Sequence, residues 1–269
     1  MHGGATIATD SILRVAWPDR CYELYHRSSN LDLRSGLSLA GPSADVSGTS
    51  RFLTTRGFRQ YQTGNAIALG SLLSSRKSLQ TTMSRRRSRR NFIRPIELTE
   101  LSTLVEQSLG CTSIVRESST GLSHAFRAWP SAGGLYPLDT YVAAARVVGL
   151  VPAIYHYNPV AQQLERLNAR DPVDVVDRGF FGQEMARQAA AVIILVASFD
   201  RTVVKYGERG YRLVLLDAGH AAQNLLLTAE QLDLDAVAVG GFHDDALASD
   251  LGLDGISEAP VHAVLVGKS

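Results

Sequence analysis

The chain has 269 residues, of which 45% are hydrophobic and 20% charged, and its formal net charge is +1. This composition is typical of a globular chain that buries its own core, as one large domain or two small ones. The near-neutral charge excludes a global electrostatic attraction to nucleic acid or to a membrane surface. The two cysteines, Cys21 and Cys111, form no CxxC pair, which predicts reduced thiols in a cytoplasmic protein.

Residues 1–80 have no sustained pattern, and we expect them to form an accessory arm. The opening residues contain no continuous apolar core, so no secretory signal is predicted. Residues 21–26 fit a short helix or strand, whereas residues 28–50 are rich in Ser and Gly and predict a loop. Residues 51–64 mix basic and aromatic side chains. They are interpreted either as a surface segment packed on the core or as a peptide-binding arm.

Stronger patterns begin near residue 81. Residues 97–109 predict a helix, with Thr99 as its N-cap and Gly110 as its stop. Residues 127–137 predict a loop, residues 139–148 a strand, and residues 153–167 a hairpin that turns at Asn158 and Pro159. Further along, residues 178–188 predict a short helix, residues 189–199 a strand buried on both faces, and residues 261–266 a final strand.

The longest apolar stretch, Leu213–Leu232, predicts a helix that is apolar on nearly every side. Polar residues within it, among them Asp217 and Asn224, argue against a transmembrane span. A polar turn broken by glycines, Lys205–Gly210, precedes this helix, and a short strand at residues 237–239 follows it. Such a helix needs a packed layer on each side or a partner subunit, so we expect a homodimer with this helix in or beside the interface.

An arginine cluster lies between Thr82 and Arg94, with six arginines in 13 residues. One interpretation is a solvated basic run or a nucleic-acid patch. Another is a phosphate site, because guanidinium groups bind phosphate with two parallel hydrogen bonds and the hydroxyl of Ser88 supplies a further donor.

Two glycine pairs are the other candidate ligand contacts. Gly133 and Gly134 lie in the sequence PSAGGLYP, where bare backbone allows a flat ligand to approach, although a plain surface turn has the same composition. Gly240 and Gly241 directly follow a strand, at the kind of strand end where α/β sheets bind ligands. Neither GxGxxG nor a P-loop motif is present. The residues His243, Asp244 and Asp245 point in divergent directions, so no metal site is predicted.

In this order, RRSRRNF (86–92), PSAGGLYP (130–137), KYGERGYR (205–212), AGHAAQN (218–224) and VGGF (239–242) resemble motifs of the nitroreductase superfamily. The set is most similar to the SagB-type or McbC-like dehydrogenases, which oxidise azoline rings of ribosomally made peptides to azoles. The resemblance covers residues 81–269, and before them only YHRSS (25–29) matches. Gly134 and Tyr136 stand where many nitroreductases have Asn and Gln, which weakens the match to a generic quinone or nitroaromatic reductase.

The resemblance implies an α+β sandwich, with a mostly antiparallel sheet flanked by helices, in an intertwined homodimer that binds FMN at its interface. It divides the chain into an arm, 1–80, and an FMN-binding domain, 81–269. The residues that it implies for the flavin phosphate and ribityl group are Arg86, Arg87, Ser88 and Arg90. The residues that the neighbouring subunit is expected to contribute to the flavin site are Pro130, Ser131, Ala132 and Gly134. Gly240 and Gly241 are expected to contact the flavin ring. Lys268 is the remaining candidate for a basic residue at the phosphate.

The implied activity is the oxidation of a peptide thiazoline or oxazoline, with Lys205 and Tyr206 as the candidate acid–base pair on the substrate side. Dioxygen is expected to reoxidise the flavin. An associated cyclodehydratase complex is a candidate partner, whereas nucleic acid and membrane are not. Three alternatives remain open: an NAD(P)H-dependent nitro or quinone reductase of the same fold, a docking subunit without catalysis, and a nucleic-acid binder that uses the arginine cluster.

Overall fold

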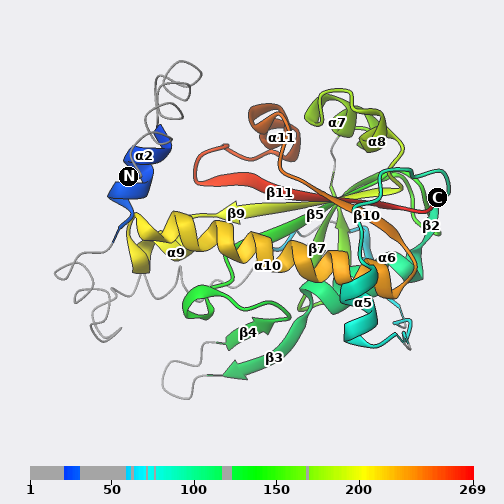
Figure 1. Cartoon of the computed structure of the whole chain (residues 1–269), viewed down its shortest axis with the longest axis horizontal. Coiled ribbons are helices and arrows are strands. Elements are labelled where there is room, and N and C mark those ends of the chain that lie inside the picture. The colour runs from blue at the N-terminus through cyan, green and yellow to red at the C-terminus, as the bar shows by residue number, and fades with distance from the viewer. Residues whose placement is uncertain are drawn as a thin grey trace, which may run out of the picture.

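The central feature of the protein is a seven-stranded antiparallel sheet, seen in a computed structural model of the chain (Figure 1). The structure describes residues 21–30, 59–61, 64–70, 72–75, 77–116, 123–167 and 170–269. The sheet order is β1-β8-β7-β5-β9-β11-β10, and every neighbouring pair is antiparallel. The strands are β1 (Ala66–Ala68), β5 (Leu138–Ala144), β7 (Ala153–Asn158), β8 (Gln163–Arg166), β9 (Ala191–Ser198), β10 (Asp235–Val239) and β11 (Glu258–Gly267).

The middle of the sheet is apolar because β5 and β9 are buried on both faces. In β9, the sequence AVIILVAS is buried at every position except Ser198, which is partly buried. A strand that is covered on both faces has no face in solvent, so its sequence is a continuous run of apolar residues rather than an alternation of apolar and polar residues. The strand predicted at 189–199 and the hairpin predicted at 153–167 are both confirmed. Asn158 shapes the hairpin turn, since its side-chain oxygen accepts hydrogen bonds from the amides of Val160 and Ala161.

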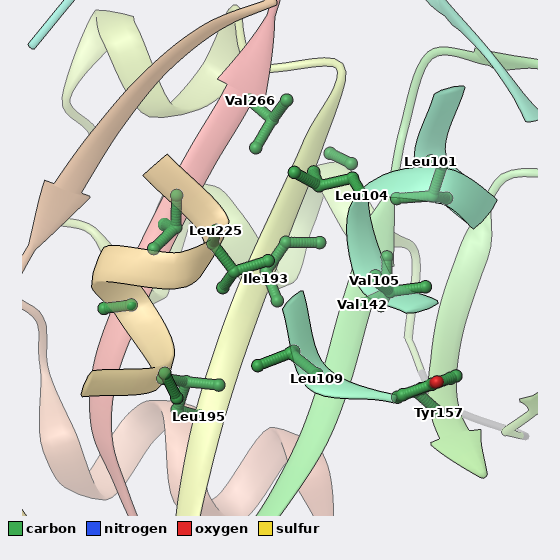
Figure 2. Close-up of a cluster of buried hydrophobic side chains, with 14 of the residues drawn as sticks. Leu101, Leu104, Val105, Leu109, Val142, Tyr157, Ile193, Leu195, Leu225 and Val266 are labelled. Carbon is green, nitrogen blue, oxygen red and sulfur yellow. The ribbon is translucent and has the colours of Figure 1, made fainter. Parts of the chain in front are cut away.

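One face of the sheet is covered by two helices, α6 (Leu98–Leu109) and α10 (Arg209–Gln231). Figure 2 shows Leu104 and Leu109 of α6, Leu225 of α10 and Ile193 of β9 meeting in this core. The opposite face carries α7 (Pro172–Gly179), α8 (Glu184–Arg187) and α11 (Asp244–Leu251), which enclose a second apolar cluster (Figure 1). These layers confirm the predicted α+β architecture of an antiparallel sheet between helices.

The remaining described elements lie around this sandwich. The helices are α2 (Cys21–Ser28), α5 (Leu79–Arg85) and α9 (Asp200–Tyr206), with a 3-10 turn, η2 (Ala132–Gly134). Two small sheets pair β2 (Ile96–Glu97) with β6 (Val147–Val148), and β3 (Cys111–Arg116) with β4 (Ser123–Arg127). Among the described residues, no helix is both long and apolar enough to cross a membrane.

Several local predictions were wrong. The predicted helix at 178–188 is two helices, because the backbone of Phe181 and Gly182 has φ of 54° and 65°, which no α-helix accommodates. The strand predicted at 139–148 divides at Ala145 into β5 and β6. The N-cap of α6 is Glu97 rather than Thr99, and its amide donates to the carboxylate of Glu100 at 2.9 Å. Gly110 does end this helix, as predicted.

Parts of the N-terminal arm contact the core. The strand β1 forms one edge of the main sheet, and α2 lies against α10, where Arg212 donates a hydrogen bond to the hydroxyl of Ser29. Arg59 and Tyr61 pack over the sheet: the amide of Arg59 donates to Asp139 and the amide of Tyr61 donates to Glu165. The surface-segment interpretation therefore holds for these two residues. Most of the loop predicted at 28–50 lies outside the described residues, and the division of the chain at residue 80 stays a prediction.

Candidate functional site

The arginine cluster contains two kinds of arginine. Arg85 and Arg89 both form ion pairs with the buried carboxylate of Glu230, at 3.4 and 3.2 Å, and Arg89 also lies 3.5 Å from Asp235. Arg86, Ser88 and Arg90 follow an extended path beyond α5 and are at least partly exposed. Within the described part of the chain, the side chains of these three residues form no hydrogen bond or ion pair.

Arg86, Ser88 and Arg90 are therefore the residues of the cluster that are available to bind an anion. Arg85 and Arg89 are already paired with the carboxylates of Glu230 and Asp235, so these two arginines fix the segment to the end of α10 and the start of β10. Arg87 is exposed and donates hydrogen bonds to the carbonyls of Ser84 and Arg86. Lys268 lies nearby, because its carbonyl accepts from Ile93, but its ammonium pairs with Glu100 at 2.6 Å.

The strand β10 connects the arginine segment to the second glycine pair. The amide of Arg89 donates to the carbonyl of Ala236 near the start of this strand, at 3.0 Å. Gly240 and Gly241 follow its far end, about 13 Å away at the usual rise of a strand. Both glycines are exposed, and a Cβ placed on either would have no neighbour within 4 Å. The strand therefore links a cationic group to an open backbone turn, which suits an elongated ligand with a phosphate at one end.

The PSAGGLYP loop is held by polar residues of α10. The hydroxyl of Ser131 donates to the carboxylate of Asp217 and accepts from the amide of Tyr136 at 2.9 Å. Asn224, two turns further along α10, donates to the carbonyl of Ala128 at 3.2 Å. Burial raises the pKa of Asp217, although the hydrogen bonds from Ser131 and the amide of Ala132 oppose that rise. The Asp217 carboxyl group therefore holds the loop through the hydrogen bonds that it accepts from Ser131 and Ala132.

Lys205 and Tyr206 lie in the last turn of α9, so the irregular turn predicted for them was wrong. Gly207, with φ of 55°, ends the helix directly after them. Their side chains nevertheless approach each other, since the ammonium of Lys205 lies 5.4 Å from the centre of the Tyr206 ring. Both reach Gly133: a Cβ placed on this glycine would stand 2.6 Å from the Tyr206 hydroxyl and 2.9 Å from the Lys205 ammonium.

The position of α9 is set by a buried ion pair. Arg201, in the first turn of α9, donates to Asp139 at 3.0 Å and to the carbonyl of Tyr136 at 3.4 Å. Burial alone would raise the pKa of Asp139, but Arg201, together with His156 and Arg59, holds it below its ordinary value. This pair thus ties the helix that carries Lys205 to the loop that carries Gly133.

Lys205 also differs from the other lysines of the chain. The sequence contains three lysines, and Lys77 and Lys268 form ion pairs with Asp233 and Glu100. Among the described residues, no carboxylate forms an ion pair with Lys205. Its ammonium is partly buried between Gly133 and Tyr206, where it is available to a ligand.

The candidate residues form two separate groups within one chain. Arg85 and Arg89 contact Glu230, near the end of α10, whereas Ser131 contacts Asp217. Thirteen helical residues separate these two anchors, which is about 20 Å. Gly134 and its neighbours therefore do not meet the arginines of the same chain, and Figure 1 shows α5 beside the C-terminal end of α10.

The sequence offered partial signals for the residues that it missed. Asp217 and Asn224 were noted only as polar interruptions of an apolar helix, yet a polar side chain on a buried face is expected to have a partner. Gly133 was considered for approach by a ligand, whereas the groups that approach it are side chains of the same chain. No three His, Cys, Asp or Glu residues of the described ranges are arranged to hold a metal ion.

The family model that matches this chain is the one described as Nitroreductase family, over residues 83–268. The chain is 32% identical to MJ1384 of Methanocaldococcus jannaschii, a protein named as a nitroreductase, over 71% of this chain and 90% of that protein. It is 30% identical to the microcin B17-processing protein McbC of Escherichia coli, over 50% of this chain and 52% of McbC. It is 26% identical to the trifolitoxin-processing protein TfxB of Rhizobium leguminosarum bv. trifolii, over 64% of this chain and 47% of TfxB. The chain thus spans about half the length of these two peptide-processing relatives.

Solved structures show the same fold. A nitroreductase-type structure from Anabaena variabilis superposes with a TM-score of 0.71 at 26% identity, and the match covers 91% of this chain and 45% of that one. A chain of the McbBCD microcin synthetase complex of Escherichia coli, with truncated pro-MccB17 bound, superposes with a TM-score of 0.56 at 19% identity. That match covers 98% of this chain and 92% of the other.

Proposed function

This chain belongs to the nitroreductase family of oxidoreductases, and on that premise we propose that it is an FMN-dependent oxidase of azoline rings in a peptide. The observation that carries the proposal is the approach of Lys205 and Tyr206 to the bare face of Gly133. In the PSAGGLYP loop, Gly134 and Tyr136 stand where many nitroreductases have Asn and Gln. This difference supports a specialised member of the family rather than a generic reductase. The names of McbC and TfxB as peptide-processing proteins support a peptide as the substrate.

The residues present fit FMN. Arg86, Ser88 and Arg90 are at least partly exposed and form no ion pair among the described residues, which suits a single terminal phosphate. Gly240 and Gly241 leave open space and free backbone where the flat ring would lie. When bound, FMN would accept the hydride that leaves the azoline ring. The chain supplies the remaining functions: placement, exclusion of water and removal of a proton.

A second copy of the chain would complete the site. The arginine group and the PSAGGLYP loop lie about 20 Å apart along α10, so one flavin would take its phosphate contacts from one protomer and Pro130–Gly134 from its partner. The exposed face of α10 supports such pairing, because it carries Tyr211, Leu215 and Leu216, with 54% of Leu216 exposed. An apolar helix face of this kind is typical of a buried interface in a symmetric dimer.

Lys205 and Tyr206 would act together on the substrate proton. Conversion of an azoline to an azole removes one proton from the ring carbon that was a residue's Cα and one hydride from the adjacent ring carbon. The Tyr206 oxygen, as a phenolate, would take the proton and become a neutral phenol, and the Lys205 ammonium, which lies near the tyrosine ring, would stabilise the phenolate before that transfer. A peptide-modifying complex is the proposed setting, since McbC is named within the McbBCD complex.

The test is mass spectrometry of an azoline-bearing peptide after incubation with the purified flavoprotein, because each oxidised ring loses two hydrogens. Lys205→Ala and Tyr206→Phe are each expected to lower turnover by about 10²-fold or more, the usual effect of losing a positioned acid–base group. Flavin content is expected to stay near the wild-type level. Lys77→Ala is the matched control, because Lys77 pairs with Asp233 and lies outside the candidate acid–base pair.

Two results would contradict the proposal in different parts. Near-normal turnover in both variants would remove Lys205 and Tyr206 from the mechanism but leave the azoline oxidation intact. Rapid flavin reduction by NAD(P)H, together with no change in peptide mass, would instead support a nitro or quinone reductase, as MJ1384 is named.

A further inference from the structure

Phe181 has a backbone conformation that its side chain does not favour. Its φ is 54°, in the left-handed region, and 62% of the residue is exposed. A bulky side chain rarely adopts this conformation, because its Cβ crowds the following carbonyl oxygen. Such an outlier persists only where the surroundings hold it, and it often marks a functional position.

Neither core packing nor turn geometry explains a phenylalanine at this position. The core contact of the turn is made by Phe180, which is fully buried, and not by Phe181. Glycine, asparagine or aspartate would satisfy a left-handed turn residue at lower energy. Gly182, with φ of 65°, fills the next position of the turn, and its amide donates to the carbonyl of Asp177 at 2.8 Å. The exposed ring is therefore the part of Phe181 that needs another explanation.

The ring of Phe181 is stacked on the ring of His243, with centres 6.0 Å apart and planes at 30°. The amide of His243 donates to the carbonyl of Gly179 at 2.7 Å, and Phe180 packs against Phe242. The turn after α7 is thus fixed to the residues that directly follow the Gly240–Gly241 turn. The side chain of His243 is also fixed, because it accepts a hydrogen bond from the amide of Ala246 at the start of α11.

We propose that Phe181 and His243 form an aromatic platform on which the five-membered azoline or azole ring of the peptide packs, beside the Gly240–Gly241 turn. This inference rests on the proposed function, since the turn is the proposed contact for the flavin ring. The azole product is flat and aromatic, and the azoline substrate carries a planar C=N unit in its five-membered ring, so an exposed aromatic ring held rigidly is suited to pack against either one. The platform would determine which ring positions along the peptide are oxidised, without taking part in proton or hydride transfer.

The decisive variant is Phe181→Asn, because asparagine accepts the left-handed conformation and removes only the ring. The melting temperature is expected to stay equal or rise, and flavin content and dimer mass are expected to stay unchanged. The KM for an azoline peptide is expected to rise about three- to tenfold with little change in kcat, the range of one aromatic contact. The Kd for the azole-bearing product peptide, measured by fluorescence anisotropy, should rise by the same factor.

Two further variants control the measurement. Phe181→Tyr keeps a flat ring, and its KM is expected to stay near the wild-type value. Ile256→Asn removes an apolar side chain that is even more exposed, at 83%, but lies outside the platform, so its KM is also expected to stay unchanged.

An unchanged KM and Kd in Phe181→Asn would overturn the platform. Dissociation of the Phe181→Asn dimer would also overturn it, since the ring would then be a contact between subunits. If the wild-type protein and all variants leave the azoline peptide unoxidised and unbound, the proposed function itself fails, and the platform fails with it.

Discussion

Substitution of Gly133 by alanine tests whether Lys205 and Tyr206 must lie against Gly133 for the peptide to be oxidised. The new methyl group would stand 2.6 Å from the Tyr206 hydroxyl and 2.9 Å from the Lys205 ammonium, closer than real side-chain contacts. Both atoms are the ends of long side chains that can rotate away. The fold therefore survives, whereas the acid–base pair is displaced from the loop.

The magnitude of the stability change follows from the backbone. Gly133 has φ of 63°, and an L-residue in the left-handed region costs about 1–2 kcal/mol. The lower entropy of the unfolded alanine chain returns about 0.4–1 kcal/mol, so the net loss is about 1 kcal/mol. For a chain of this size that corresponds to a decrease of about 2–4 °C in melting temperature. Gly252→Ala is a matched control, because Gly252 has φ of 71° and open space around its Cβ position.

The two variants are compared by calorimetry, by flavin content and by peptide oxidation. Both are expected to lose the same small amount of stability and to retain flavin. Only Gly133→Ala is expected to lose oxidation, by about 10²-fold, because a displaced acid–base group loses its contribution. If Gly133→Ala oxidises the peptide within threefold of the control, the contact with Gly133 does not position the pair, and the reasoning is refuted.

Three other results are expected. Joint replacement of Arg86 and Ser88 by alanine should abolish flavin binding. The control Arg166→Ala, which removes an exposed arginine of β8, should keep its flavin. Full flavin occupancy of the double variant would refute the phosphate assignment. Leu216→Arg should convert the flavin-loaded dimer to a flavin-poor monomer in light scattering, because it charges the exposed face of α10; an intact dimer would exclude that face from the interface. Since burial raises the pKa of Asp217, its contribution to stability is present below its unfolded pKa of about 4 and is lost as the pH rises through the folded pKa. Asp217→Asn should therefore gain stability relative to wild type from about pH 4 upward in thermal melts, and a relative loss would contradict the raised pKa.

Sequence patterns were sufficient to predict the elements with a long apolar run or a clear turn signal. The run AAAVIILVASF suited a strand buried on both faces, because it is short, continuously apolar and rich in β-branched residues, and the structure confirms this prediction. The hairpin at 153–167 carried its own turn signal in Asn158 and Pro159. The helix α9 was missed because its seven residues, DRTVVKY, have too few apolar positions to show a helical period.

The resemblance proposed a set of candidate site residues, but the sequence did not reveal their arrangement. From a run of similar arginines, the resemblance selected Arg86, Arg87, Ser88 and Arg90, and this selection stays a prediction. Arg85 and Arg89 differ from that set because they pair with Glu230, which is more than 140 positions away in the sequence. The convergence of Lys205 and Tyr206 on Gly133 depends likewise on the buried pair of Arg201 and Asp139. Contacts between distant segments leave no local periodicity, so sequence patterns do not reveal them.

The position of β11 determines how the protein must be made. β11 lies between β9 and β10 in the sheet, although it follows both of them in the chain. During synthesis, one edge of β9 therefore has no partner until roughly 70 more residues have been added, which takes about 4–14 s at ribosomal rates. That edge is apolar along nearly its whole length and offers unpaired backbone groups to any other nascent chain. Protection of this open edge from aggregation during these seconds therefore contributes to the yield of folded protein, independently of the stability of the finished fold.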